Sequence, residues 1–276
     1  MRLQRFSPAA PLADVIDAVW VAEVPEPPRL TILPGTSPVA CFQFGGAVTS
    51  GQGAERRVTR SGMTGMQNQA QEYGADNTLR AVMVRFTPWG AATILRESLD
   101  AFYNRHFDLA DILPAHLIRT VEAQLHDATT APDRLWIVQR FLLGQRNAAS
   151  WDPLIRNAVD NIRKHEGQVQ VKALARDYLI SERQLERRFR QIIGTSPKQF
   201  SRIVRFQAAI RYGARGLSWA AVAQQTGYSD QSHLIKEFQA LAGHSPESLL
   251  SQPPSMLAQH FNNHPGTSGF YNTVFL

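Results

Sequence analysis

Alternating apolar and polar positions dominate the first part of the chain. Residues 39–44 (VACFQF) alternate, and residues 79–88 (LRAVMVRFTP) have the pattern of a strand that a proline ends. A glycine-rich stretch over residues 45–53 lies between them and favours turns. This pattern predicts a mostly β region up to about residue 115.

Apolar residues at three- and four-residue spacing follow this region. Residues 91–97, 117–128 and 132–145 have this period, which predicts three helices. Residues 144–151 have no such period, and we interpret them as a linker.

From residue 152 onward the whole pattern is helical. Asp152 is expected to cap a helix that Pro153 begins, and a longer helix is predicted over residues 198–214. Three further helices are expected to follow the cap residues Ser181, Ser218 and Asp230.

One short pattern occurs twice in this helical region. SERQLERRFRQIIGTSPKQF (181–200) returns in altered form as DQSHLIKEFQALAGHSPESL (230–249), with a cap residue, Leu, Phe, Gly and Ser-Pro at the same spacing. Each copy follows a short helix that contains a small residue, Ala175 or Ala223, where two helices can cross closely. Each copy is therefore predicted to complete a helix-turn-helix.

The spacing of the two copies favours DNA over other partners. Two units held about 34 Å apart could contact two successive major-groove segments. The helix between them has some 17 residues and would span roughly 25 Å, so with the width of the units that separation is reachable. A helical module that binds protein stays an alternative, but it explains neither the paired units nor the charge distribution.

The net charge of +6 lies entirely on the helical region. Residues 152–250 contain fifteen Lys/Arg and nine Asp/Glu, whereas residues 1–151 contain fourteen of each. A basic segment beside a neutral one indicates a polyanion-binding module attached to another domain, although a solvated basic face would give the same count.

Composition excludes several other classes of protein. The single cysteine, Cys41, permits no intrachain disulfide and no cysteine-rich zinc site. No apolar run reaches the roughly 18 residues that cross a bilayer, and no signal peptide is visible, so we expect a cytoplasmic protein.

The segment from about residue 159 to 250 resembles the DNA-binding domain of AraC/XylS-type transcription regulators. The resemblance rests on LARDYLISERQLERRFRQIIGTSPKQF and VAQQTGYSDQSHLIKEFQALAGHSPESL. It implies seven helices, of which the third and sixth enter consecutive major grooves. RFTPWGA (85–91) is similar to a Phe-x-Pro-Gly-Gly turn in the sensory domain of such regulators, but Trp89 stands in place of a glycine.

We therefore expect an α+β protein with two main domains. A β-rich, sensor-like domain with trailing helices occupies residues 1–145, and an all-α domain with two helix-turn-helix units occupies residues 152–250. The tail, residues 251–276, ends in GFYNTVFL, which is unusually apolar for a free terminus. It is expected to pack back on the N-terminal domain, as an added strand, with an ordinary frayed end as the alternative.

The outward side chains of the two predicted reading helices are the candidate base contacts. Arginine can bind guanine with two hydrogen bonds, glutamate can accept from cytosine and glutamine can pair with adenine. The resemblance implies base contacts for Arg183, Glu186 and Arg187, and the outward face of the second reading helix adds Gln231, Ser232, His233 and Lys236. For Glu186 the alternative is an ion pair with Arg190, four residues on. His233 has a cap or surface position as its alternative.

Phosphate contacts are expected from other basic residues. They lie on the first reading helix and in a basic stripe along the helix over 198–214, and they are Arg188, Arg190, Lys198, Arg202 and Arg205. The alternative is a solvated basic face.

A small-molecule effector is the expected ligand of the N-terminal domain. The candidate pocket residues are Trp20, Phe42, Phe44, Tyr73, Arg85 and Trp89, although aromatic residues more often form a core. The chain has no phosphate-binding glycine loop, no G-x-S-x-G and no metal-spaced carboxylates, and HFNNH (260–264) lacks further ligands.

We therefore interpret the chain as a sequence-specific transcription regulator and not as an enzyme. No cofactor or metal is expected; the partners would be double-stranded DNA, RNA polymerase and an effector, with the chain a monomer or homodimer. The alternative is a DNA-repair enzyme that uses the helical region for docking. Such proteins carry both acceptor and zinc-ligand cysteines, which Cys41 alone cannot supply.

Overall fold

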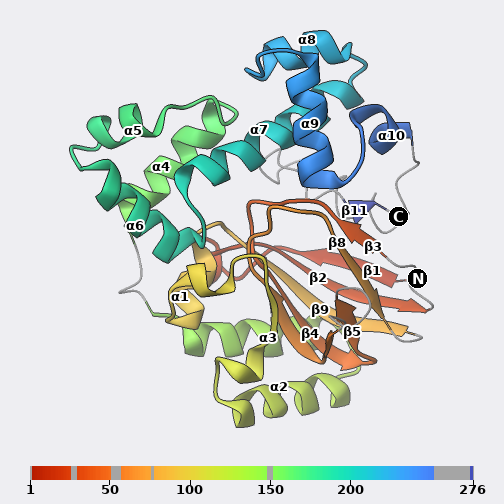
Figure 1. Cartoon of the computed structure of the whole chain (residues 1–276). Helices are drawn as coiled ribbons and strands as arrows, with labels where there is room; N and C mark the ends of the chain where they lie inside the picture. The colour runs from red at the N-terminus through yellow and green to blue at the C-terminus, as the bar shows by residue number, and fades with distance from the viewer. Residues whose placement is uncertain are drawn as a thin grey trace.

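The computed structural model describes residues 2–25, 30–50, 57–75, 78–147, 152–251 and 274–275. We call residues 2–147 the front part and residues 152–251 the helical part. Figure 1 shows the sheets of the front part below and the helices of the helical part above them. The predicted α+β class, with a β-rich first region and an all-helical second one, is confirmed.

Two antiparallel sheets form most of the front part. The first has the strand order β1–β2–β9–β4–β7–β10, and the second has the order β11–β3–β8–β5–β6. The strands of the first sheet are β1 (Arg2–Phe6), β2 (Ile16–Pro25), β9 (Thr78–Phe86), β4 (Val39–Gly45), β7 (Ser61–Thr64) and β10 (His106–Asp108). Those of the second are β3 (Leu30–Ile32), β8 (Gln71–Ala75), β5 (Val48–Ser50), β6 (Arg57–Thr59) and β11 (Val274–Phe275).

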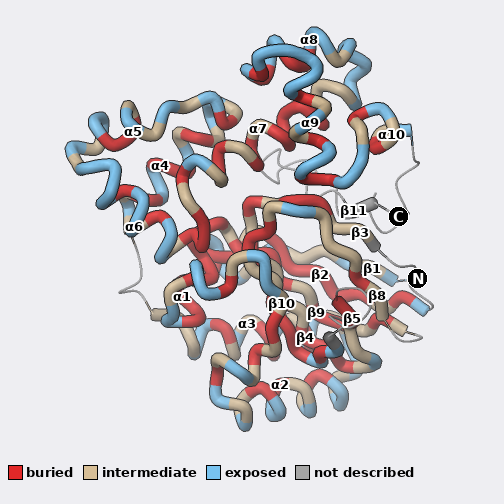
Figure 2. The backbone as a smooth tube through the Cα atoms, in the orientation of Figure 1, coloured by how far each residue is buried: buried red, intermediate tan, exposed pale blue. Residues whose placement is uncertain are grey.

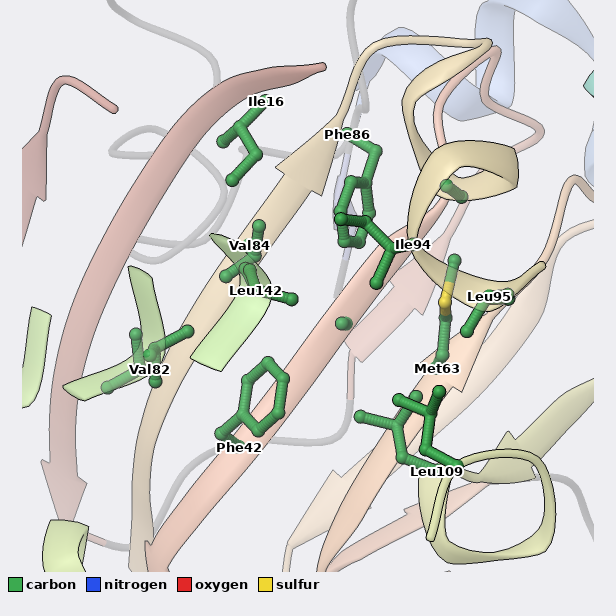
Figure 3. Close-up of a cluster of buried hydrophobic side chains, with 14 of the residues drawn as sticks. Ile16, Phe42, Met63, Val82, Val84, Phe86, Ile94, Leu95, Leu109 and Leu142 are labelled. Atoms are coloured by element: carbon green, nitrogen blue, oxygen red, sulfur yellow. The ribbon is translucent and has the colours of Figure 1, made fainter. Parts of the chain in front are cut away.

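The main core lies between the first sheet and three helices. Successive side chains of a strand point to opposite faces, so one face gathers the alternate apolar residues of β2, β4 and β9. They pack against α1 (Gly90–Leu95), α2 (Ala115–Asp127) and α3 (Ala131–Gln145), and Figure 3 shows Phe42, Val82 and Val84 together with Ile94 and Leu142. The three predicted helices are thus confirmed to within a few residues at each end.

A smaller apolar cluster joins the two sheets. It contains Ala22 and Ala81 from the first sheet, with Val48 and Ala75 of the second packed against it. The front part is therefore layered: second sheet, first sheet, then helices.

Seven helices form the helical part. They are α4 (Pro153–Lys164), α5 (Val171–Asp177), α6 (Glu182–Ile193), α7 (Pro197–Ala214), α8 (Trp219–Gln225), α9 (Gln231–Ala242) and α10 (Pro246–Ser251). The predicted caps hold: the Asp152 carboxylate accepts from the amides of Leu154 at 3.0 Å and Ile155 at 3.3 Å, which begins α4. Within the described residues, none of the helices is both long enough and apolar enough to span a bilayer.

The helical part packs on one end of the front part. Met66 and Trp89 join the core of α4, α5 and α6, and Leu33 joins the core of α7, α8 and α9. Backbone polar groups also meet across this seam, because the Ala70 amide donates to the Leu241 carbonyl at 2.8 Å.

Trp89 is part of this seam. Its indole Nε1 donates to the carbonyl of Asp14 at 2.9 Å, and the guanidinium carbon of Arg156 on α4 lies 5.3 Å from its ring centroid. The residue that stands in place of a glycine in RFTPWGA therefore connects the front part to the helical part, which a glycine could not do.

The described end of the tail lies on the second sheet. Val274 pairs with Ile32 and Phe275 with Thr31, antiparallel, so β11 adds to the edge of β3. Residues 252–273, which include His260 and His264, lie outside the described residues.

Deleting residues 268–276 should lower the melting temperature of the full chain. Loss of the β11–β3 pairing removes edge-strand hydrogen bonds, and about 1 kcal/mol would correspond to roughly 2–4 °C for a protein of this size. Differential scanning calorimetry of both chains measures the shift; an unchanged midpoint would show that the last residues add no stability.

Candidate nucleic-acid interface

Two helix pairs have the geometry of a helix-turn-helix: α5 with α6, and α8 with α9. In each pair the small residue at the crossing is buried, Ala175 in the first and Ala223 in the second. Figure 1 shows the two pairs at opposite ends of α7. We call α6 and α9 the reading helices.

The caps fix where the reading helices begin. At α6, Ser181 and Gln184 form a reciprocal capping box. At α9, the Asp230 carboxylate accepts from the His233 amide at 2.8 Å, and that hydrogen bond lowers the pKa of Asp230. His233 also lies near the cap through its ring Nδ1, 3.1 Å from the Ser229 hydroxyl.

The outer face of α6 carries exposed side chains. Leu185 and Phe189 are fully buried, whereas the candidate base contacts Arg183, Glu186 and Arg187 are exposed. In Figure 2 the tube of α6 alternates between buried and exposed positions accordingly. This face is therefore open to a large ligand.

Ion pairs divide the basic residues of α6 into two groups. Arg190 bonds Glu186 at 2.9 Å, the intrahelical alternative expected for Glu186, and Arg188 bonds Asp152 through two atoms at 2.8 and 2.7 Å. Within the described ranges, Arg183 and Arg187 have no ion-pair partner. They are the arginines of α6 best placed to bind another molecule.

The outer face of α9 is open but less basic. Leu234 and Phe238 are fully buried, and Ile235 is half-buried. All four candidate base contacts of this helix are exposed: Gln231, Ser232, His233 and Lys236.

The basic stripe predicted along α7 is only partly free. Lys198 is exposed, but Arg202 donates to both carboxylate oxygens of Glu237 on α9, at 2.6 and 3.1 Å. Arg205 forms a long hydrogen bond with the Gly167 carbonyl, at 3.4 Å, and its guanidinium carbon lies 5.5 Å from the ring centroid of Tyr228. Both arginines therefore hold the two units together, and any phosphate would compete with these contacts.

Sequence reasoning missed Glu237, Gly167 and Tyr228, the partners in these contacts. Glu237 follows Lys236 and lies 35 residues beyond Arg202, so no short-range pattern links the pair. Only the folded arrangement brings them together.

The six candidate effector residues do not share one pocket. Phe42 and Phe44 lie in the core beneath the helices, whereas Trp20 and Arg85 come from the opposite face of the same sheet. Arg85 bonds Asp17 at 2.6 Å and its guanidinium carbon lies 5.0 Å from the Trp20 ring centroid. Burial lowers the pKa of Arg85, which the Asp17 charge opposes.

The remaining two candidates, Tyr73 and Trp89, lie apart from these four residues and from each other. The Tyr73 hydroxyl bonds Thr64 and Gln67, each at 3.1 Å, and Trp89 lies in the seam. Strand alternation and the seam therefore separate these six residues, and which of them contacts an effector stays a prediction.

A small cavity lies at the seam. It is partly open to solvent and has room for no more than about one water molecule. Its lining is apolar and includes Met63, Leu99 and Phe102 of the front part and Ile193 at the end of α6. None of the six candidate effector residues lines it, and the described residues hold no cluster of three or more His, Cys, Asp or Glu.

Two segments of the chain match known families. Residues 174–252 match a helix-turn-helix domain, and residues 4–108 match a domain of unknown function, DUF6597. No curated protein matches the chain in sequence.

Several solved structures are similar to this chain. The C-terminal domain of AraT, a response regulator from Geobacillus stearothermophilus, has 22% identity and a TM-score of 0.35, covering 41% of this chain and 98% of that one. ToxT from Vibrio cholerae O395 has 10% identity and a TM-score of 0.43, covering 90% and 97%. ToxT from strain SCE256, solved with an unsaturated fatty acid bound, has 12% identity and a TM-score of 0.43, covering 84% and 94%.

The two capped units and the match over residues 174–252 define a helix-turn-helix protein. More narrowly, this segment is a helix-turn-helix domain of the AraC type, as the paired Leu, Phe, Gly and Ser-Pro positions indicate.

Leu179→Gly should stabilise the first unit. Leu179 lies in the turn before α6 at φ 55°, where Gly227 lies at φ 72° in the second unit, and its side chain is 92% exposed. Left-handed backbone costs a residue with a Cβ about 1–2 kcal/mol, and the greater chain entropy of glycine offsets about 0.5–1 kcal/mol of that. We expect the free energy of unfolding, measured by urea denaturation, to rise by about 0.5 kcal/mol.

Leu179→Ala is the matched control. Alanine removes the exposed side chain but keeps the Cβ, so its stability should stay near that of the parent chain. Equal stabilities for the glycine and alanine variants would show that backbone strain is not relieved there.

Proposed function

We propose that the chain is a sequence-specific, DNA-binding transcription regulator whose reading helices α6 and α9 read successive major grooves. The observation that carries this proposal is that both candidate reading faces are exposed at once, on helices whose other sides are buried. A surface covered by the front part would have made the role impossible.

Base reading is assigned to the exposed polar side chains of the two helices. Arg183 and Arg187, which lack ion-pair partners within the described ranges, can each bind guanine through two bonds. Glu186 is held by Arg190 and would have to exchange that pair for a cytosine contact. The mixed face of α9, including Gln231 and Lys236, would make the weaker contribution.

Phosphate binding is assigned first to Lys198, which is exposed. Arg188, Arg190, Arg202 and Arg205 would contribute only by sharing their present partners. If about six phosphates are neutralised, the logarithmic salt slope of affinity should be near −5.

Control by the front part is the second element of the proposal. The front part touches the C-terminal end of each reading helix: Leu99 lies against Gly194 just after α6, and the Ala70 amide donates to the Leu241 carbonyl in α9. A ligand that moved the front part would therefore move both readers. We propose residues 1–145 as this controlling domain, residues 152–250 as the reader and residues 251–276 as a tie between them.

Selection of bound duplexes from a random pool with the full chain tests the proposal. We expect recovered sequences with two conserved half-elements centred about one helical turn, some 10 base pairs, apart. Recovery of sequences without any shared element would contradict it. Mass spectrometry of native material for a co-purified small molecule tests the effector, and sedimentation with RNA polymerase tests that partner.

Arg187→Ala should remove the preference at one base pair of the selected site. One base contact made through two hydrogen bonds is worth about 1–3 kcal/mol of discrimination, whereas binding to random DNA should change little. Titrations against the selected duplex, its single-base variants and random duplex measure both quantities.

Lys198→Ala is the matched control for charge. It should weaken binding to all duplexes alike and reduce the salt slope by about 1. If Arg187→Ala behaves in the same way, with equal losses on specific and random DNA, its base-reading role is wrong.

A further inference from the structure

The turn that leads into the first helix-turn-helix unit contacts the second unit as well as α7. The turn between α4 and α5, residues 166–168, reaches the second unit: the Gln168 amide Nε2 donates to the Gln225 carbonyl at 3.0 Å. Gly227 lies directly against Gln168, since a Cβ on this glycine would come 2.7 Å from the Gln168 Oε1. A single helix is therefore not the only spacer between the reading helices.

Arginines of α7 complete this contact region. Arg202 bonds Glu237 of the second unit, and Arg205 contacts both Gly167, in the turn before the first unit, and Tyr228 of the second unit. Arg211 bonds the Glu166 carboxylate at 2.7 Å. We call the contributing residues the inter-unit joint: Glu166, Gly167, Gln168, Arg202, Arg205, Arg211, Gln225, Tyr228 and Glu237.

The joint is closely packed. Gly167 lies at φ 79°, and a Cβ there would come 2.2 Å from the Ser201 carbonyl on α7, so only glycine lets the turn approach that helix. Tyr228 is only 5% exposed beneath Arg205, and its burial raises the pKa of its hydroxyl, with the Glu237 charge adding to the effect.

The Arg202–Glu237 ion pair fixes the orientation of α9, which the other contacts of this helix leave open. The Ala70–Leu241 hydrogen bond lies near the C-terminal end of α9, and the packing of the buried Leu234 and Phe238 has no directional preference of its own. Glu237 lies about one helical turn nearer the N-terminal end of α9 than Leu241 does. The planar Arg202 guanidinium donates two hydrogen bonds to its carboxylate, and this geometry fixes the orientation of α9 at that point. Two anchor points define the direction of the helix.

We propose that the inter-unit joint, with the Arg202–Glu237 bridge as its decisive contact, fixes the angle between the two reading helices. The joint thereby determines which spacing between DNA half-elements the protein accepts. Arg202 and Glu237 are positioning residues in this proposal, and the DNA consequence rests on the proposed function above. A shift of one base pair turns a half-element by about 34–36° about the duplex axis, so a rigid joint penalises it and a loose one tolerates it.

A spacing series tests the DNA consequence with the full chain. The duplexes carry the two selected half-elements at their recovered separation and at one base pair more or less. The parent chain should lose at least about tenfold in affinity at either altered spacing, and Arg202→Met should lose less than about threefold relative to its own best duplex. Glu237→Gln keeps the packing but removes one charge of the pair. It should broaden the profile of affinity against spacing in the same way.

Lys198→Met is the matched control, since it removes one positive charge from the same helix without touching the joint. Its affinity should fall alike at all spacings, so its profile should stay as narrow as that of the parent. The double variant Arg202→Glu with Glu237→Arg restores the pair in reverse and should recover the narrow profile. An unchanged profile in both Arg202→Met and Glu237→Gln would overturn the proposal.

A second measurement needs no DNA and separates the joint from the proposed function. Because Cys41 is the single cysteine, a Cys41→Ser chain can carry spin labels at Lys172→Cys on α5 and Gln224→Cys on α8, both exposed. Pulsed dipolar spectroscopy should give one narrow distribution of label-to-label distances for the parent chain and for Lys198→Met. The distribution should be broader in Arg202→Met. It should be narrow again in the double variant with the reversed charges. Equal widths in all chains would overturn the joint even where DNA binding is specific. A failed DNA selection with the expected widths would overturn only the proposed function.

Discussion

Each reading helix is anchored on one side and at more than one point, and the exposure of its other side depends on this constraint. For α6 the anchors are the buried Phe189, the Arg188–Asp152 pair and the close approach of Leu99 to Gly194 beyond its end. For α9 they are the buried Phe238, the Arg202–Glu237 pair and the Ala70–Leu241 bond. Charged side chains on the inner side thus orient the helices, and those on the outer side remain for a ligand.

Basic residues of the same type therefore have different roles at the interface, because some are held by carboxylates and others are exposed. Arginines that look equivalent in sequence differ in what they already bind, and an arginine held by two hydrogen bonds to a carboxylate costs more to redirect than one that faces water. Counting basic residues therefore overstates the charge that is free for phosphate. The exposed pair Arg183 and Arg187 gains importance for the same reason.

Much of the helical part could be predicted because its signals are local. Caps such as Asp152 and Ser181, the stop at Gly194 and the three- and four-residue apolar spacing each act within one or two turns of chain. The front part was harder. Alternation located β4 and β9, but the short strands β5 and β6 have no comparable run of residues. The effector candidates were drawn from both faces of the first sheet, from β8 and from the seam. The seam residue Trp89 and the pair Arg202–Glu237 depend on contacts between distant segments, which no periodicity encodes.

The apolar cavity at the seam has a mechanical consequence. Its lining combines core residues of the front part with Ile193 at the end of α6, and it has few polar groups to hold ordered water. Separating the seam would let solvent fill that space, so the separated state would occupy the smaller total volume. Hydrostatic pressure favours the smaller volume and should therefore loosen α6 from the front part.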